Sequence, residues 1–205
     1  MDRSEVRRAW ERVSERYASS RNADGPDAAL IDDLLDSLPS DPEPLVLDIG
    51  CGDGERTLKN LPRGAVGLDF ARRGLELAAA GHPDARLVQG EMSAIPLRAD
   101  SVDAITAYHA VFHVPRTDQP AVYGEFARVL EPGGRLLMTL PAGEYETVRR
   151  GWMGGPMFFA SPGRAATLRS LEAAGFGIDR TERTDDPLGS ETEFVFATLS
   201  DGKTV

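Results

Sequence analysis

The chain has 205 residues, 41% of them hydrophobic, and a formal net charge of −10. This length suffices for one sizeable core, so a single domain over residues 1–205 is expected. The acidic balance argues against a nucleic-acid partner, and no apolar segment resembles a secretory signal or reaches membrane-spanning length. We therefore expect a cytoplasmic protein without nucleic-acid or membrane partners, as a monomer or homodimer.

Acidic residues dominate the charge. Aspartate and glutamate total 33, while the lysines are Lys59 and Lys203. The composition is typical of a soluble acidic surface, and it also motivates a second hypothesis, adaptation to high salt. An unfolding midpoint that does not rise from low to molar KCl would contradict that hypothesis. The lone Cys51 cannot form an internal disulfide, which favours a reducing compartment.

Helices and strands alternate along the predicted chain. The N-terminus predicts helices over 2–17 and 27–38, which form an N-terminal cap over residues 1–40. Strands are predicted at 45–49, 65–69, 86–89, 103–108 and 135–140, and helices at 55–61, 71–80, 119–130 and 163–174. Two closing strands, near 177–183 and 192–199, are predicted to form a hairpin through Asp186-Pro187-Leu188-Gly189. The alternation predicts an α/β fold with a doubly wound, mostly parallel sheet.

The most informative stretch is LVLDIGCGDG, residues 45–54, in which an apolar strand ends in three alternate glycines. Such a loop marks a site for a nucleotide-like cofactor. The dinucleotide pattern G-x-G-x-x-G would place its third glycine at Glu55, and Asp48, Asp53 and Glu55 would face the phosphates unfavourably. S-adenosylmethionine carries an ammonium, a sulfonium and no phosphate, so the loop favours it. We expect Asp48, Gly50, Cys51 and Gly52 at this cofactor.

Asp69 ends the second predicted strand, about twenty residues beyond the loop, where ribose recognition requires an acid. A carboxylate there accepts both ribose hydroxyls, and Phe70 is expected to cover one adenine face. A strand-end aspartate is also a common helix N-cap. Because the glycine loop precedes Asp69 at the expected spacing, we favour the ribose contact over the N-cap role.

The fourth strand ends in a segment with two histidines, AYHAVFH, residues 107–113. Ligands of open α/β sheets bind beyond the carboxyl ends of strands, so Ala107 is expected at the cofactor and Tyr108 at the acceptor. His109 is the candidate general base, because imidazole titrates near neutral pH. A structural histidine bonded to a loop carbonyl is the alternative, favoured for His113, and a metal pair would need a third ligand that is not evident.

An aromatic and methionine cluster occupies residues 143–162, between glycines and prolines. One interpretation is a hydrophobic cap on the sheet edge. The other is an acceptor pocket or lid, in which Trp152, Phe158 and Phe159 contact a small, largely apolar substrate beside His113.

Four motifs in this order carry a family resemblance: VLDIGCGDG, GLDF, QGEMSAIPLRADSVDAI and EFARVLEPGGRLLMTLP. Together they resemble the class I S-adenosylmethionine-dependent methyltransferases, over roughly residues 17–176. The nearest branch is the small single-domain one that includes the quinone-biosynthesis C-methyltransferases. The resemblance implies a seven-stranded Rossmann-like sheet with an antiparallel last strand, N-terminal helices over the cofactor site, and methyl transfer to an acceptor.

The resemblance also implies further cofactor contacts. Glu91 occupies the place of the acid that binds the adenine amino group, and Met92 follows it against the ring. Tyr17 is expected to close on the amino-acid end of the cofactor, and Arg21 to pair with its carboxylate. In-line placement of nucleophile, methyl and sulfur would then provide most of the acceleration.

Two other functions remain open from the sequence. A non-catalytic S-adenosylmethionine-binding protein would keep the same loop and release no S-adenosylhomocysteine. A nicotinamide-dependent oxidoreductase is disfavoured by the missing third glycine and by the carboxylates of the loop. The acceptor atom is not specified by the fold.

Overall fold

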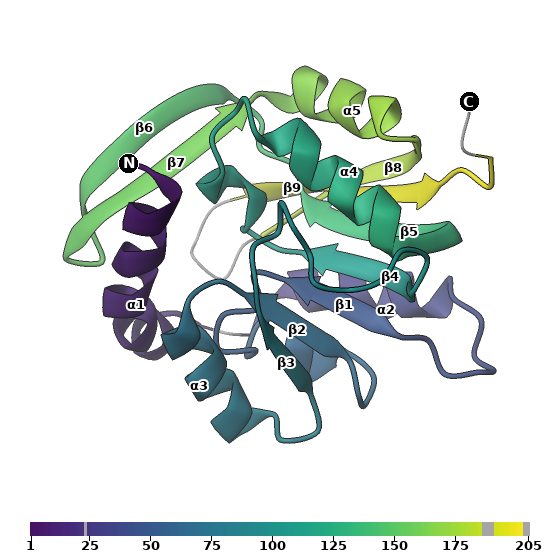
Figure 1. The fold of residues 1–205 in the computed structure, drawn as a ribbon, viewed down its shortest axis with the longest axis horizontal. Helices are drawn as coiled ribbons and strands as arrows, with labels where there is room; N and C mark the ends of the chain where they lie inside the picture. The colour runs from purple at the N-terminus through teal and green to yellow at the C-terminus, as the bar shows by residue number, and fades with distance from the viewer. Residues whose placement is uncertain (23, 186–190, 203–205) are drawn as a thin grey trace.

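A computed structural model describes residues 1–22, 24–185 and 191–202. It contains one central sheet with helices on both faces, and a separate two-stranded hairpin (Figure 1). The α-helices are α1 (Arg3–Ser20), α2 (Ala29–Asp36), α3 (Arg72–Gly81), α4 (Gln119–Val129) and α5 (Arg164–Ala173). Short 3₁₀ turns are η1 (Pro26–Ala28), η2 (Leu58–Asn60) and η3 (Val111–His113).

The central sheet has seven strands in the order β3-β2-β1-β4-β5-β9-β8. Their bounds are β1 (Val46–Ile49), β2 (Val66–Asp69), β3 (Arg86–Gln89), β4 (Val102–Ala107), β5 (Leu130–Thr139), β8 (Phe176–Asp185) and β9 (Glu191–Leu199). The first five strands run parallel, and β9 is antiparallel to both β5 and β8. The predicted Rossmann-like sheet with an antiparallel last strand is confirmed, and β8 forms its edge. The predicted link at 186–189 lies outside the described residues.

The two faces of the sheet are covered by different helices. Side chains of α4 and α5, including Phe126 and Leu171, share one core cluster with β1, β4 and β5. Leu30, Ile31 and Leu34 of α2 belong to a second cluster with Val46 of β1 and residues of β4, β5 and β9. Helix α2 therefore covers the sheet, and only α1 of the two N-terminal helices lies over the expected cofactor site. The apolar face of α2 explains this correction, because it needs a sheet to pack on.

The predicted helix over 55–61 is wrong, because the segment forms turns and η2. Side-chain contacts hold it in this shape. Thr57 donates to the Asp48 carboxylate, and Arg56 donates to Asp27 Oδ2 through Nε at 3.1 Å and Nη2 at 2.7 Å. These bonds to separate elements replace the hydrogen bonds of a regular helix.

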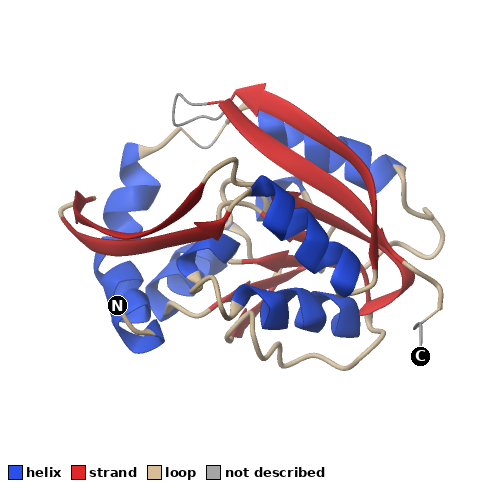
Figure 2. Ribbon diagram, turned by 90° about the horizontal axis from the view of Figure 1, so that it is seen from above, coloured by secondary structure: helices blue, strands red, loops and turns tan. Residues whose placement is uncertain are grey.

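The aromatic segment at 143–162 folds into an antiparallel hairpin of β6 (Glu144–Trp152) and β7 (Gly155–Pro162). Met153 and Gly154, with φ of 48° and 81°, form its tight turn, because a two-residue hairpin turn of this kind needs positive φ at both positions. The hairpin lies beside α1 at the left of Figure 1, and Figure 2 shows it projecting from the body of the molecule. The glycines at and beside its turn thus belong to a regular hairpin.

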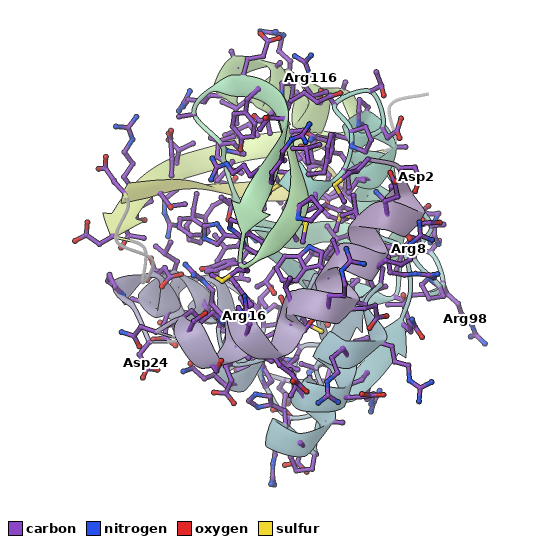
Figure 3. All side chains as sticks on the ribbon, turned by 90° about the vertical axis from the view of Figure 1, so that its left-hand side faces the viewer. Asp2, Arg8, Arg16, Asp24, Arg98 and Arg116 are labelled. Atoms are coloured by element: carbon purple, nitrogen blue, oxygen red, sulfur yellow. The ribbon has the colours of Figure 1, made fainter. Side chains whose placement is uncertain are left out.

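Two arginines connect the hairpin to its surroundings. Arg16 of α1 donates to the carbonyl oxygen of Met153 at 3.2 Å, and Arg116 pairs with Glu144 and, at 3.3 Å, with Glu146. Figure 3 shows α1 crossing in front, with the labelled Arg16 and Arg116 on either side of the hairpin. The hairpin is therefore attached both to α1 and to the segment that follows η3.

Candidate functional site

Two neighbouring cavities open near the carboxyl ends of β1 and β4. The strands that follow β1 in the chain lie on one side of this pair and those that follow β4 lie on the other, so this is the topological switch point of the sheet. This switch point is where ligands of open α/β sheets bind. The first cavity is lined by the glycine loop, the end of β2 and α1, and the second by the hairpin, the end of β5 and the start of β9. Four residues line both cavities: Trp10, Tyr17, His109 and His113.

The glycine loop forms the floor of the first cavity through Gly50, Cys51 and Gly52, as predicted. Gly50 has φ of +71°, and a Cβ there would lie 2.6 Å from the Cβ of Ala110. Gly52 has φ of +55°, and a Cβ there would meet nothing within 4 Å. The chain therefore needs glycine at position 50 for close packing, whereas at position 52 a side chain would project into open space beside the cavity.

Cys51 is buried beside these glycines and has no disulfide partner. Burial raises the pKa of its thiol, and the nearby carboxylates of Asp69 and Asp48 raise it further. A thiol of this kind is not ionised near neutral pH, so Cys51 packs the loop and does not act as a nucleophile.

Asp69 also lines the first cavity, at the end of β2. Its Oδ2 accepts from the amide of Gly52 at 2.9 Å, and its Oδ1 accepts from the amide of Ala71 at 2.8 Å. Burial raises the pKa of this carboxyl to about 6, against the lowering effect of the two amides. Because each carboxylate oxygen has two lone pairs, Asp69 holds the loop and still has acceptor capacity toward the cavity.

Asp48 and Ala107 do not line the cavity, contrary to the expectation that both bind the cofactor. Both are buried in strands, β1 and β4. The Asp48 carboxylate accepts from Thr57 and, at 2.8 Å, from Thr106 Oγ1, and burial raises its pKa to about 6. Asp48 therefore positions the segment after the glycine loop, including the cavity-lining Thr57. Ala107 belongs to the core cluster because its strand is covered on that face.

Helix α1 spans the first cavity and is tied down at both ends. Arg3 pairs with Glu91, in the segment after β3, and Arg21 pairs with Asp53 of the glycine loop. Between them, the Glu11 carboxylate accepts from the amides of Arg72 and Arg73, at 2.8 and 2.9 Å, at the start of α3. A carboxylate at a helix N-terminus is favourable, so this contact fixes α1 on α3.

Arg21 and Tyr17 lie at the cavity as predicted, but Arg21 has a partner that the sequence did not suggest. Its side chain is 3% exposed and pairs with Asp53, which is 9% exposed. The guanidinium also lies 4.9 Å from the centroid of the Tyr17 ring. Its Nε is buried without a hydrogen-bond partner among the described residues. Arg21 therefore retains one donor for a ligand.

The far end of the first cavity is lined by Phe70, Glu91 and Met92, in agreement with the sequence prediction. Other lining residues were missed: Arg3, Trp10, Ser14, Asp53, Arg56, Thr57, Leu68, Ala71, Gly74, Gly90, Ala110 and Val114. For Trp10 a signal existed in the apolar stripe of α1. Arg3 and Ser14 reach the cavity because α1 crosses over it, whereas the other missed residues belong to β2, α3 and the segments that follow β1, β2, β3 and β4.

The second cavity has a volume of about 300 Å³ and strongly aromatic walls. Trp152 and Phe159 line it as predicted, together with Phe112 and Tyr145, which were not predicted at the substrate. Phe158 does not line it, although both Phe158 and Phe159 belong to the core cluster formed with Val6, Ala9 and Val13 of α1. Adjacent strand residues point to opposite faces, so Phe158 and Phe159 cannot both face one cavity.

His113 is buried between the cavities and is held by the hairpin. Its Nδ1 lies 2.8 Å from the carbonyl oxygen of Phe158, and since a carbonyl can only accept, Nδ1 carries the proton and Nε2 is an acceptor. Burial lowers the pKa of this imidazole to about 4, so it is neutral at pH 7. His113 was expected to bond to a loop carbonyl. It does bond to a backbone carbonyl, but that carbonyl belongs to strand β7.

His109 has a left-handed backbone, with φ of +53°, and its amide donates to Thr139 Oγ1 at 2.8 Å. Non-glycine residues in this conformation are uncommon and often occur at functional sites. Its ring lies 6.0 Å from that of Phe112 and 6.3 Å from that of Phe194. No group of three or more His, Cys, Asp or Glu side chains within the described ranges is arranged to hold a metal ion.

Tyr108, which was expected at the acceptor, lines the first cavity and not the second. Its hydroxyl donates to the carbonyl oxygen of Asp27 at 3.0 Å, and burial raises its pKa. The hydroxyl is used to hold η1 against the end of β4. None of the helices formed by the described residues has the length and hydropathy needed to cross a membrane.

Comparison with known proteins shows which family the chain resembles. Residues 46–134 match the model described as "Methyltransferase domain". A probable S-adenosylmethionine-dependent methyltransferase of Mycolicibacterium smegmatis is 28% identical over 138 residues, which cover 66% of this chain and 53% of that protein. A demethylmenaquinone methyltransferase of Streptomyces avermitilis is 28% identical over 138 residues, covering 65% and 59%. The chain thus spans little more than half the length of these two relatives.

Residues 46–134 thus match a methyltransferase domain, and the chain is similar to S-adenosylmethionine-dependent methyltransferases. Solved structures agree on the fold. The magnesium protoporphyrin IX methyltransferase of Synechocystis, with bound S-adenosylhomocysteine, superimposes with a TM-score of 0.71 at 16% identity, covering 97% of this chain and 100% of that one. The (4+2)-cyclase SpnF superimposes with a TM-score of 0.66 at 18% identity, covering 85% and 81%.

S-adenosylmethionine is the cofactor of this family, and the first cavity of the methyltransferase domain fits its chemistry. The open space at Gly52 admits close approach of a ligand to the backbone. Asp69 retains acceptor capacity for hydroxyls, and the unpartnered Nε of Arg21 is a donor for a carboxylate.

Proposed function

We propose that this protein is an S-adenosylmethionine-dependent methyltransferase that acts on a small-molecule acceptor by in-line methyl transfer. One observation carries the proposal. The cavity that fits the cofactor and the aromatic cavity beneath the hairpin share a wall, formed by Trp10, Tyr17, His109 and His113. A donor in one cavity and an acceptor in the other would therefore meet at these residues.

On the cofactor side, Asp69 is assigned to the ribose hydroxyls and Arg21 to the carboxylate of the amino-acid end. Phe70 and Met92 flank the adenine, near Glu91. When bound, S-adenosylmethionine supplies an electrophilic methyl group with the sulfur as leaving group. The domain contributes mainly the position of the two reactants, since alignment alone provides much of the acceleration of such a transfer.

On the acceptor side, His109 is assigned as the group that takes up a proton where the acceptor must lose one. His113 is a weaker candidate, because a pKa of about 4 makes it a poor base at pH 7. The acceptor-only Nε2 of His113 instead suits the orientation of a hydroxyl or amine. His113 is therefore assigned as a positioning residue at the boundary of the cavities.

A cavity of about 300 Å³ supports a small acceptor, because it lies at the lower end of the range for small-molecule sites. The net charge of −10 is unfavourable for a nucleic-acid acceptor. The acceptor side thus favours a metabolite over a polymer.

The experiment has two steps. Calorimetry with S-adenosylhomocysteine and with NAD tests the cofactor, and binding of NAD alone would contradict the proposal. Incubation with methyl-labelled S-adenosylmethionine and a small-metabolite extract then tests transfer. Label in a small molecule, with release of S-adenosylhomocysteine, is the expected result.

Cofactor binding without transfer of label to any extract component would favour a second function. The likeness to the (4+2)-cyclase SpnF shows that this fold is not confined to proteins named as methyltransferases. In that outcome, the chain would bind the cofactor without using its methyl group.

A further inference from the structure

Three charged side chains line the second cavity: Glu191, Glu193 and Arg149. Glu193 of β9 accepts from Arg164 Nε at 2.9 Å and lies 3.7 Å from Arg183 Nη2. Glu191 lies 3.9 Å from Arg183 Nη1. Both acids are therefore paired with arginines, Arg164 and Arg183, that do not line the cavity, and Glu193 Oε2 is buried without a hydrogen-bond partner among the described residues. Arg149 of β6 also lines the cavity, and it forms no ion pair or side-chain hydrogen bond with any described residue.

The arginines of the first cavity differ in this respect. Arg3 pairs with Glu91, Arg21 with Asp53, and Arg56 with Asp27. Among the arginines that line either cavity in the described part of the chain, Arg149 alone lacks a carboxylate partner. The lining of the second cavity thus holds Glu191, Glu193 and Arg149, and of these the two acids are paired with arginines while the Arg149 guanidinium has no carboxylate partner among the described residues.

The position of Arg149 directs this charge at a ligand. Its guanidinium lies 4.8 Å from the centroid of the Phe159 ring, which lines the same cavity. Stacking on an aromatic face holds the guanidinium plane while leaving its N–H groups in that plane to donate. The flat walls of Tyr145, Trp152 and Phe159 are beside it.

We infer that the acceptor is a flat, apolar molecule with one carboxylate group, which Arg149 binds while the aromatic walls hold the ring. A guanidinium matches a carboxylate with two parallel hydrogen bonds. A phosphate dianion would need a second cation or a cluster of backbone amides, and the single guanidinium without a carboxylate partner suits a monoanion. The reacting atom then lies at the opposite side of the molecule, toward His109 and His113. This inference rests on the proposed function, since it names the acceptor class of the same site.

The chain offers a direct reporter for this test. Its two tryptophans, Trp10 and Trp152, both line the second cavity, so intrinsic fluorescence responds to a ligand there. The probes are para-hydroxyphenylacetate and para-hydroxybenzoate, each compared with its neutral amide, in the presence of saturating S-adenosylhomocysteine. The proteins are the wild type, Arg149→Gln, and the control Arg150→Gln. Arg150 is the exposed neighbour on β6 and does not line the cavity.

The expected result is quenching by the acids at about tenfold lower concentration than by the amides, because a charge-assisted hydrogen bond is lost with the charge. Arg149→Gln removes this preference and Arg150→Gln keeps it. Equal binding of acid and amide, no binding of either, or the same loss in both variants would overturn the inference. Calorimetry with S-adenosylhomocysteine on the same three proteins separates this failure from that of the proposed function, because Arg149 does not line the first cavity.

Discussion

His113 and Phe158 are joined by a hydrogen bond of 2.8 Å, from the imidazole Nδ1 to the backbone carbonyl oxygen. This bond connects η3, which follows β4, to β7 of the hairpin. It fixes the tautomer of His113 and so presents Nε2 as an acceptor between the two cavities. The structural hydrogen bond at Nδ1 thereby determines that Nε2 of His113 accepts a hydrogen bond.

The first prediction concerns Asp69, which we assign to the ribose. Asp69→Ala removes the acceptor of the Gly52 amide as well as the assigned ribose contacts. We expect S-adenosylhomocysteine to bind at least about tenfold more weakly, as a lost charge-assisted hydrogen bond implies. Calorimetry measures the change. Asp84→Ala is the matched control, since Asp84 is an exposed residue paired with Arg63. An unchanged affinity in Asp69→Ala would mean that the ribose assignment is wrong.

The second prediction is a pH dependence of cofactor binding. The pKa of Asp69 is about 6 in the ligand-free protein, so the carboxylate that accepts hydroxyl protons is lost below this pH. Affinity for S-adenosylhomocysteine should fall up to about tenfold per pH unit below about pH 6. Titrations from about pH 7.5 to about pH 5 measure it, and Asp69→Asn should lose this slope. A flat profile in the wild type would contradict the assignment.

The stability of the ligand-free protein should follow the opposite trend at this residue. Folding raises the pKa of Asp69 from its ordinary value of 3.8, so the folded state binds the proton more tightly. The contribution to the free energy of unfolding is fully present below about pH 4 and is lost as the pH rises through about 6. Urea denaturation of the wild type and Asp69→Asn across this window measures the difference. A difference between the two that does not vary with pH would contradict the raised pKa.

The third prediction concerns Gly52, where φ is +55° and a Cβ would enter open space. Gly52→Val should abolish binding of S-adenosylhomocysteine, because a β-branched side chain is strained in this conformation and projects toward the ligand. Gly64→Val is the control, since Gly64 has φ of +80° and does not line either cavity. Both variants should lose similar stability, and only the first should lose binding. Retained binding in Gly52→Val would exclude the loop as the cofactor site.

The fourth prediction separates the two aromatic roles in the hairpin. Phe158→Ala should lower the free energy of unfolding by about 3–5 kcal/mol, because Phe158 is buried in the core cluster with α1. Trp152→Ala should cost less stability, since Trp152 is half-buried and lines the second cavity. Urea denaturation and acceptor-probe binding measure the two effects. Loss of probe binding in Trp152→Ala, with unchanged affinity for S-adenosylhomocysteine, is the expected pattern.

The Rossmann-like sheet and the loop at Gly50 and Gly52 could be predicted from the sequence, because their signals are local. A buried apolar run that ends in alternate glycines admits few other structures, and Asp69 follows at the end of the next parallel strand. The positions of Phe70, Glu91 and Met92 depend on the same short segments, and the structure brings all of these to one cavity.

The remaining contacts depend on which elements pack together, which local patterns do not specify. Asp48 was expected at the cofactor, yet it faces Thr57 and Thr106 inside the protein. Phe158 and Phe159 are both aromatic and both belong to the core cluster with α1, but the alternation along β7 lets only Phe159 also line the second cavity. The ion pair of Arg21 with Asp53, and the lack of one at Arg149, follow from distances between segments far apart in the chain. Local sequence thus determined the cofactor loop, and the packing of α1 and the hairpin decided what surrounds the acceptor.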